Sequence, residues 1–124
     1  DIQQSTVNNT GFIAGVALNY GGRDELLRTV KKVAEKVNNG EISPDNITEE
    51  TIADNLDTAG VPDPDLLIRT SGEQRLSNFL MWQLAYTEFY FTDVAWPDFH
   101  KEDLIRAIEK YNGRDRRYGG VKEE

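Results

Sequence analysis

The sequence predicts an α/β fold in which a parallel β-sheet is flanked by helices. Two short apolar runs, residues 12–18 and 66–68, lack the alternation of a strand with one wet face, so both are expected to be strands buried on both faces. An aromatic run at residues 89–91 has the composition of a third, short strand. Segments with helical periodicity separate these runs, as the crossovers of a parallel sheet require.

The first half of the chain is expected to open with the end of a helix, before a turn at residues 8–11 and the first strand. A Gly-Gly turn at residues 21–22 then enters a helix that stops at residues 38–40. The apolar positions of this helix have helical spacing: Leu26, Val30, Val33 and Val37. Thr48, followed by two glutamates, is expected to cap a short helix that ends near Asp57.

The second half begins with a proline turn at residues 61–65, which cannot be helical. After the strand at 66–68 and a polar loop, Ser77 or Asn78 is expected to cap a helix through residues 80–85.

The last helix is expected to follow a turn at residues 96–97, with Asp98 as its cap. Its apolar residues are Leu104, Ile105, Ile108 and Tyr111. The single histidine, His100, stands near the start of this helix without a Cys, Asp or Ser constellation, so we expect a capping or surface residue there.

Composition limits the classes of function. The length of 124 residues indicates one domain, and 38% hydrophobic and 29% charged residues are ordinary for a globular protein. A net charge of −8 argues against general nucleic-acid binding, because phosphate backbones are bound by clustered Lys and Arg. The absence of cysteine excludes disulfides and thiolate metal sites and is compatible with a reducing cytoplasm.

Candidate chemistry is concentrated in the polar loop at residues 69–77, which contains Arg69, Arg75 and Ser77. Arginine offers a rigid fork of donors that fits phosphate oxygens, and serine hydroxyls add short-range donors. A loop beyond the carboxyl end of a strand is where open α/β sheets bind ligands. These features indicate a diphosphate site; the alternative is a surface loop whose arginines pair with Glu73 or other acids.

Glu88 lies between an apolar segment and the aromatic strand. A lone carboxylate is usually solvated, but diphosphate sites commonly need Mg²⁺, which takes one or two carboxylates together with phosphate oxygens and water. If the loop binds diphosphate, Glu88 is therefore the candidate Mg²⁺ ligand.

Two further motifs have simpler interpretations. Residues 19–23, Asn-Tyr-Gly-Gly-Arg, lack the lysine and the spacing of a Walker loop and are expected to form a tight turn between strand and helix. Arg114, Arg116 and Arg117 form a basic cluster at the expected end of the last helix, where positive charge is favourable.

The order of these motifs closely resembles that of the cis-prenyltransferases, and in particular the bacterial branch that makes undecaprenyl diphosphate. The resemblance runs through essentially the whole chain. It depends on the following motifs: residues 9–11, 19–23, 68–79, Trp82, Gln83, Tyr86, Glu88, residues 96–99 and 116–120.

The resemblance implies roles for individual residues. Arg69, Arg75 and Ser77 match the residues that hold the diphosphate of isopentenyl diphosphate. Glu88 matches an acidic residue that helps to bind Mg²⁺ there.

Two other regions also match. Arg117 and Gly119 belong to an Arg-x-Gly motif that reaches the active site of the other subunit of a homodimer. Phe12 lies in a strand that lines the tunnel for the growing prenyl chain. The implied location is the cytoplasm, with peripheral contact at the inner face of the membrane for product release.

The implied activity is the cis-addition of isopentenyl units to farnesyl diphosphate, which makes the lipid carrier for bacterial cell-wall polymers. The family's first motif, Asp-Gly-Asn-Gly-Arg, supplies the essential Asp, and nothing in this sequence matches it. The chain is therefore expected to be the C-terminal part of a single catalytic domain, without a catalytic residue of its own and inactive alone. The alternatives are a non-catalytic partner subunit and an acidic α/β interaction domain with no ligand.

Overall fold

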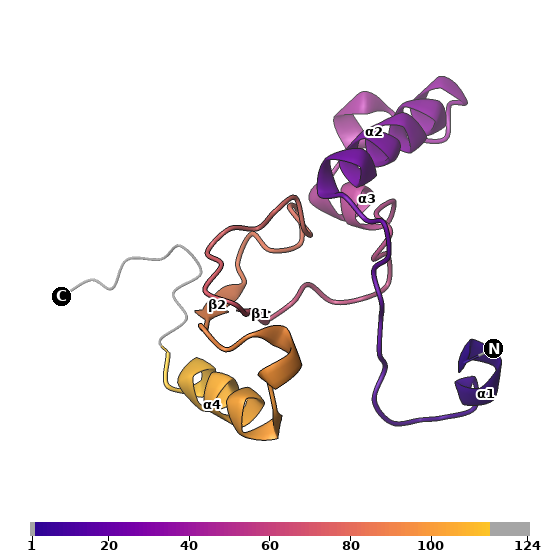
Figure 1. Cartoon of the computed structure of the whole chain (residues 1–124). Helices are drawn as coiled ribbons and strands as arrows, with labels where there is room; N and C mark the ends of the chain where they lie inside the picture. The colour runs from indigo at the N-terminus through magenta and orange to yellow at the C-terminus, as the bar shows by residue number, and fades with distance from the viewer. Residues whose placement is uncertain (1, 115–124) are drawn as a thin grey trace.

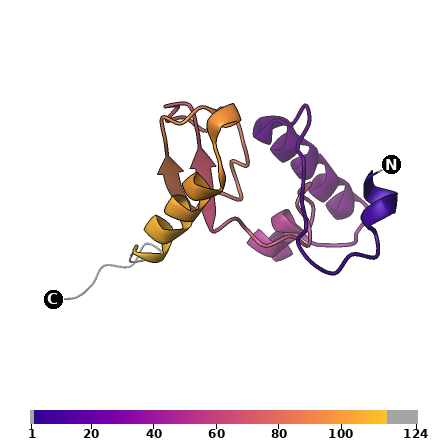
Figure 2. The same cartoon turned by 60° about the horizontal axis from the view of Figure 1, so that its bottom comes forward.

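The structure, a computed structural model, describes residues 2–114. Its regular elements, in chain order, are α1 (Ile2–Thr6), α2 (Gly22–Asn38), α3 (Glu49–Ala53), β1 (Leu66–Arg69), β2 (Glu88–Phe91) and α4 (Lys101–Asn112). Helices α2 and α3 lie together, whereas β1, β2 and α4 form a second group (Figure 1). The turned view shows the same two groups, joined by extended chain (Figure 2).

The two strands pair in parallel, with Leu66 opposite Glu88 and Arg69 opposite Phe91. Helix α4 packs against β2. The predicted α/β class, a parallel sheet flanked by helices, is confirmed by this arrangement. The pairing continues beyond the strands, because the Thr92 N–H donates to the Arg69 carbonyl at 3.0 Å.

The helices of the first half follow the local sequence signals. Helix α2 begins at the predicted Gly-Gly turn and ends where the Asn-Asn-Gly stop was expected. Thr48 caps α3 as predicted, since its hydroxyl accepts the Thr51 N–H at 3.2 Å, but the helix ends at Ala53, earlier than expected. Among residues 2–114, no helix has the length and apolar character needed to cross a membrane.

The predicted cap of the last helix was wrong. Asp98 lies in a short 3-10 turn, Trp96–Asp98, and His100 is the residue that precedes α4. The Asp103 carboxylate accepts the His100 N–H at 2.9 Å and so fastens this start of the helix. His100 is thus a capping residue, which was one of its two expected roles.

The prediction of a buried strand at residues 12–18 was also wrong. This segment is extended but unpaired, and the Phe12 side chain is 94% exposed. A strand of this kind needs neighbouring strands to pair with its backbone and helices to cover its faces, and no strand within residues 2–114 pairs with this segment.

The helix expected through residues 80–85 does not form; the segment consists of turns. Ser77, Asn78 and Leu80 have φ angles of +50°, +64° and +42°. Such left-handed residues cannot be part of a right-handed helix, so no helix can start at Ser77, Asn78 or Leu80.

The buried residues of the described chain are as often polar as apolar. The apolar ones are Val33, Leu56, Leu84 and Ala107, and the polar ones are Glu25, Thr29, Asn55 and Gln83. The Glu25 carboxylate, 1% exposed, accepts the Tyr20 hydroxyl, the Asp57 N–H at 2.9 Å and the Gln83 Nε2 at 3.2 Å. This network joins α2 to the chain after α3 and to the segment that follows the polar loop.

Candidate functional site

The polar loop lies at the carboxyl end of both strands. Beyond β1 it is fastened to the segment that follows β2, because the Ser71 N–H donates to the Val94 carbonyl at 2.9 Å and the Gly72 N–H donates to the Thr92 carbonyl at 3.0 Å. Both Ser71 and Gly72 have positive φ, so a sharp turn is held there. This is the edge at which open α/β sheets bind ligands.

The structure brings Arg69 and Arg75 together. Both line a cavity of about 210 Å³ whose other walls are Leu67, Ile68, Leu76 and Phe79. The Arg69 Nε is buried and has no hydrogen-bond partner within the described chain. Buried donors are almost always satisfied, so an anion bound by the Arg69 guanidinium would supply an acceptor that the described residues lack.

Arg75 forms an ion pair with Glu73, as the surface-loop alternative anticipated. The Nη2–Oε2 distance is 2.5 Å, and the Arg75 side chain is 70% exposed. An ion pair this exposed contributes at most about 1 kcal/mol, so the guanidinium can exchange Glu73 for a more highly charged anion at little cost.

Ser77 is exposed and is not among the residues that line this cavity. It lies in a strained stretch, since four non-glycine residues between positions 71 and 80 have positive φ. Backbone strain of this kind persists only where surrounding contacts enforce it, and it is concentrated at ligand sites.

The contact that holds this stretch comes from Asn78, whose role was not predicted. The Asn78 carbonyl accepts the Gly22 N–H at 2.7 Å, and its Oδ1 accepts the Arg23 N–H at 2.9 Å. Asn78 therefore caps α2, rather than the helix expected after it. One sequence signal could have indicated this: the residue before α2 is Gly21, which has no side chain to cap the helix.

Glu88 lies at the opposite end of the strands from the loop. It opens β2 opposite Leu66, three positions before the pair of Arg69 and Phe91, which amounts to about 10 Å along the strands. Its half-buried carboxylate pairs with the Arg114 guanidinium at 2.6 Å. The described chain therefore does not bring Glu88 and the arginine cavity together.

The fit of Mg²⁺ to these residues is partial. No cluster of three or more His, Asp or Glu side chains that could hold a metal occurs between residues 2 and 114. Glu88 can act only as a single carboxylate ligand, with phosphate oxygens and water as the others, which is a common environment for Mg²⁺.

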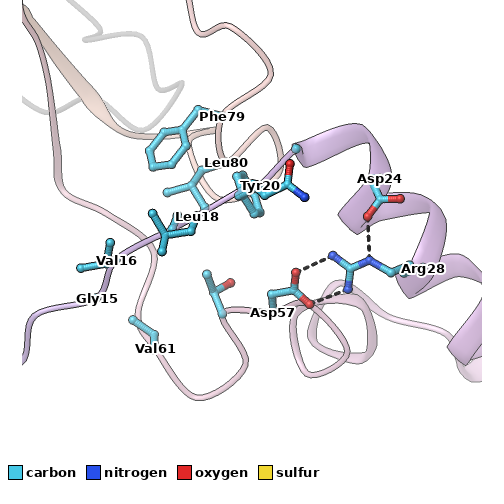
Figure 3. Close-up of a pocket in the computed structure, with 14 residues that line it drawn as sticks. Gly15, Val16, Leu18, Tyr20, Asp24, Arg28, Asp57, Val61, Phe79 and Leu80 are labelled. Carbon is cyan, nitrogen blue, oxygen red and sulfur yellow. Dashed lines mark hydrogen bonds and ion pairs between the residues drawn. The ribbon is translucent and has the colours of Figure 1, made fainter. Parts of the chain in front are cut away.

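A second cavity, of about 650 Å³, lies beside the start of α2. Val16, Leu18, Phe79 and Leu80 give it an apolar side (Figure 3). Phe12 is not part of its lining.

The polar side of this cavity is an ion-pair cluster. The Arg28 guanidinium donates two hydrogen bonds to Asp57, at 2.7 and 2.5 Å, and one to Asp24 at 2.8 Å (Figure 3). These bonds from Arg28 lower the pKa of Asp57. Burial and the hydrogen bond to Glu25 raise the pKa of Tyr20, another lining residue.

Arg117 and Gly119, the residues assigned to the Arg-x-Gly motif, lie outside the described residues.

Comparisons with known proteins agree with these features. Residues 1–119 match the model of the prenyltransferase family described as undecaprenyl diphosphate synthase. The isoprenyl transferase of Clostridium perfringens is 56% identical over 119 residues, which are 96% of this chain and 47% of that protein. The isoprenyl transferase of Rhizobium meliloti is 51% identical over 121 residues, or 98% of this chain and 49% of that protein. The chain thus spans about half the length of the curated relatives it matches.

Solved structures show the same similarity. One is lavandulyl diphosphate synthase from Lavandula x intermedia in complex with dimethylallyl diphosphate. The match has a TM-score of 0.80 and 48% identity, and it covers 83% of this chain and 44% of the synthase chain. A probable undecaprenyl diphosphate synthase from Campylobacter jejuni matches 95% of this chain and 52% of its own with a TM-score of 0.79 and 34% identity. The parallel strand pair, the arginine loop and these matches together establish that the chain belongs to the isoprenyl transferase family of undecaprenyl diphosphate synthases.

Proposed function

We propose that this chain supplies the isopentenyl diphosphate side of a cis-prenyltransferase that condenses isopentenyl diphosphate with farnesyl diphosphate into undecaprenyl diphosphate. The observation that carries the proposal is the cavity shared by Arg69 and Arg75 at the carboxyl end of β1 and β2, together with an Arg69 Nε that has no partner among the described residues. In this proposal the two guanidinium groups and the Ser77 hydroxyl hold the diphosphate of isopentenyl diphosphate.

The contribution of these residues is positioning and charge neutralisation, which is most of what a protein can give to diphosphate chemistry. In the condensation, the bond between the allylic carbon and its diphosphate breaks and diphosphate leaves. The isopentenyl double bond attacks that carbon to form the new carbon–carbon bond, and a proton is lost. Arg69 and Arg75 would keep the isopentenyl group oriented for the attack by binding its distal charge.

Further parts of the proposal extend beyond residues 69–77. Glu88, which lies at the opposite end of the strands from the arginine cavity, would hold Mg²⁺, and the metal would add positive charge for a bound diphosphate. Arg117 and Gly119 would act in a homodimer, and Phe12 would line the prenyl tunnel. The reaction would take place in the cytoplasm, with release of the product to the membrane.

Because the chain spans about half the length of its relatives, we propose the full reaction for the complete enzyme and no turnover for these 124 residues alone. Polyprenyl product from the purified chain, free of full-length enzyme, would contradict this part of the proposal.

Calorimetric titration of the 124-residue chain with isopentenyl diphosphate tests the proposed site. We expect Arg75→Ala to weaken binding at least tenfold, because a charge-assisted bond to phosphate is lost. Arg106→Ala is the matched control, since Arg106 is 65% exposed and has a similar ion pair, with Asp103, on α4. Equal affinities for the wild type, Arg75→Ala and Arg106→Ala would disprove the site.

A further inference from the structure

The start of α2 is capped by a residue that is distant in sequence. Gly21, the residue before the helix, makes no side-chain capping bond. The first two helical N–H groups, of Gly22 and Arg23, donate instead to the carbonyl and to the Oδ1 of Asn78. Two of the four donors that a helix leaves unpaired at its start are thus satisfied from a loop 55 residues away.

The glycine pair before α2 makes this contact sterically possible. A Cβ on Gly21 would lie 2.8 Å from the Asn78 Nδ2, and a Cβ on Gly22 would lie 3.2 Å from the Asn78 carbonyl oxygen and 3.0 Å from the Met81 Cγ. The two glycines of the Asn-Tyr-Gly-Gly-Arg motif therefore leave the space that Asn78 needs to bond to the start of α2.

The same asparagine is the first residue after the stretch proposed to bind diphosphate. Asn78 directly follows Ser77, and both have left-handed backbone conformations, with φ of +64° and +50°. Asparagine adopts this conformation more readily than most residues. Because the Asn78 backbone and side chain are both bonded to α2, the backbone of Ser77 is held as well.

We propose that Asn78 is a positioning residue that holds residues 69–77 against the N-terminus of α2 in the conformation that binds diphosphate. The inference rests on the proposed function, because it assumes that Arg75 and Ser77 are ligands. Coupling between two sites is reciprocal, so diphosphate bound at the loop must also stabilise the contact between Asn78 and α2.

The simpler alternative is that Asn78 is only a helix cap. A cap of that kind stabilises the fold but does not change ligand affinity below the unfolding transition. Loss of Asn78 lowers the stability of the fold in both roles, but it lowers the affinity for diphosphate only if Asn78 is a positioning residue.

The test measures the affinity of the 124-residue chain for inorganic pyrophosphate by calorimetry, at a temperature where every variant is folded. We expect Asn78→Ala to weaken binding about fivefold or more. Asn78→Gly should have a smaller effect, because it keeps the left-handed φ and the carbonyl bond to Gly22. Thr48→Ala, which removes the cap of α3 at a distance from the loop, is the matched control and should bind as the wild type does.

A second measurement needs no substitution. Saturating pyrophosphate should slow amide hydrogen exchange at Gly22 and Arg23 in the wild-type chain. Unchanged exchange there, or wild-type affinity in Asn78→Ala while Arg75→Ala loses binding, would overturn the positioning role and leave the diphosphate site in place. Wild-type affinity in Arg75→Ala would overturn the site, and the positioning role with it.

Discussion

Arg28 and Asp57 are joined by two hydrogen bonds, of 2.7 and 2.5 Å, that link α2 to the chain after α3. The Asp57 N–H also donates to the buried Glu25 carboxylate at 2.9 Å. Asp57 is therefore fixed by its backbone and by its side chain, and the geometry of the second cavity depends on this residue.

The acid dependence of stability should reveal this ion pair. Arg28 lowers the pKa of Asp57 in the folded chain below its unfolded value of about 3.9. The pair thus stabilises the fold above that pH, and its contribution is lost as the pH falls through the folded pKa. Asp57→Asn should lower the free energy of unfolding by about 0.5–1 kcal/mol at pH 7, since both side chains are partly exposed.

Urea unfolding at pH 7 and at pH 2 measures this difference. The gap between the wild type and Asp57→Asn should be smaller at pH 2, and the exposed Asp63 provides the control variant Asp63→Asn. A gap of the same size at both values would show that the ion pair is not its cause.

The buried Glu25 should be the most sensitive position of α2. Its replacement by alanine leaves donors of Tyr20, Asp57 and Gln83 without their acceptor. We expect a loss of about 3 kcal/mol in the free energy of unfolding at pH 7. Glu35→Ala, at an exposed position of the same helix, should change it by less than about 0.5 kcal/mol, and equal losses for both variants would contradict the network.

Tyr20 should make the stability of the fold decrease at alkaline pH, whereas Asp57 makes it decrease at acid pH. Burial and Glu25 raise the pKa of Tyr20 in the folded chain above the unfolded value of about 10. The stabilisation is complete below pH 10 and declines as the pH rises above it, because the unfolded chain releases the proton first. Tyr20→Phe should therefore be less stable than the wild type at pH 7, and the difference should narrow at pH 11. A constant difference across this range in urea unfolding would refute the assignment.

The sequence predicted the elements whose signals are local. The spacing of Val30, Val33 and Val37 indicated α2, and Thr48 indicated the start of α3, since periodicity and capping act within a few residues. The parallel pairing of β1 and β2 was expected from apolar runs without alternation and from helical segments between the strands, and it forms even though the helix expected at 80–85 does not.

The predictions that were wrong concern segments whose structure depends on contacts between residues distant in sequence. Apolar spacing predicted a helix through 80–85 with Ser77 or Asn78 as its cap, but Asn78 accepts bonds from α2 instead, and Leu80 has a left-handed backbone. Similarly, nothing near Glu88 in sequence indicates Arg114, 26 residues later, because α4 must first pack against β2. Arg69 and Arg75 could be predicted from composition, whereas Arg114 as the partner of Glu88 could not.

The pair of Glu88 and Arg114 leads to a prediction about metal binding. The guanidinium is already at hydrogen-bond distance from the only carboxylate assigned to Mg²⁺, so the two cations must compete for Glu88. Mn²⁺ serves as a spectroscopic substitute for Mg²⁺. In the presence of pyrophosphate, Arg114→Ala should strengthen Mn²⁺ binding about threefold or more, because the ion pair that the metal must displace contributes up to about 1 kcal/mol at this exposure. Free Mn²⁺ measured by electron paramagnetic resonance reports the affinity directly.

Lys110→Ala is the matched control, since Lys110 carries the same charge near the end of α4 but lies over the Tyr90 ring, 5.5 Å from its centroid. An equal gain in both variants would indicate a general charge effect, whereas a gain confined to Arg114→Ala and abolished by adding Glu88→Gln would identify Glu88 as the residue for which the metal and the arginine compete.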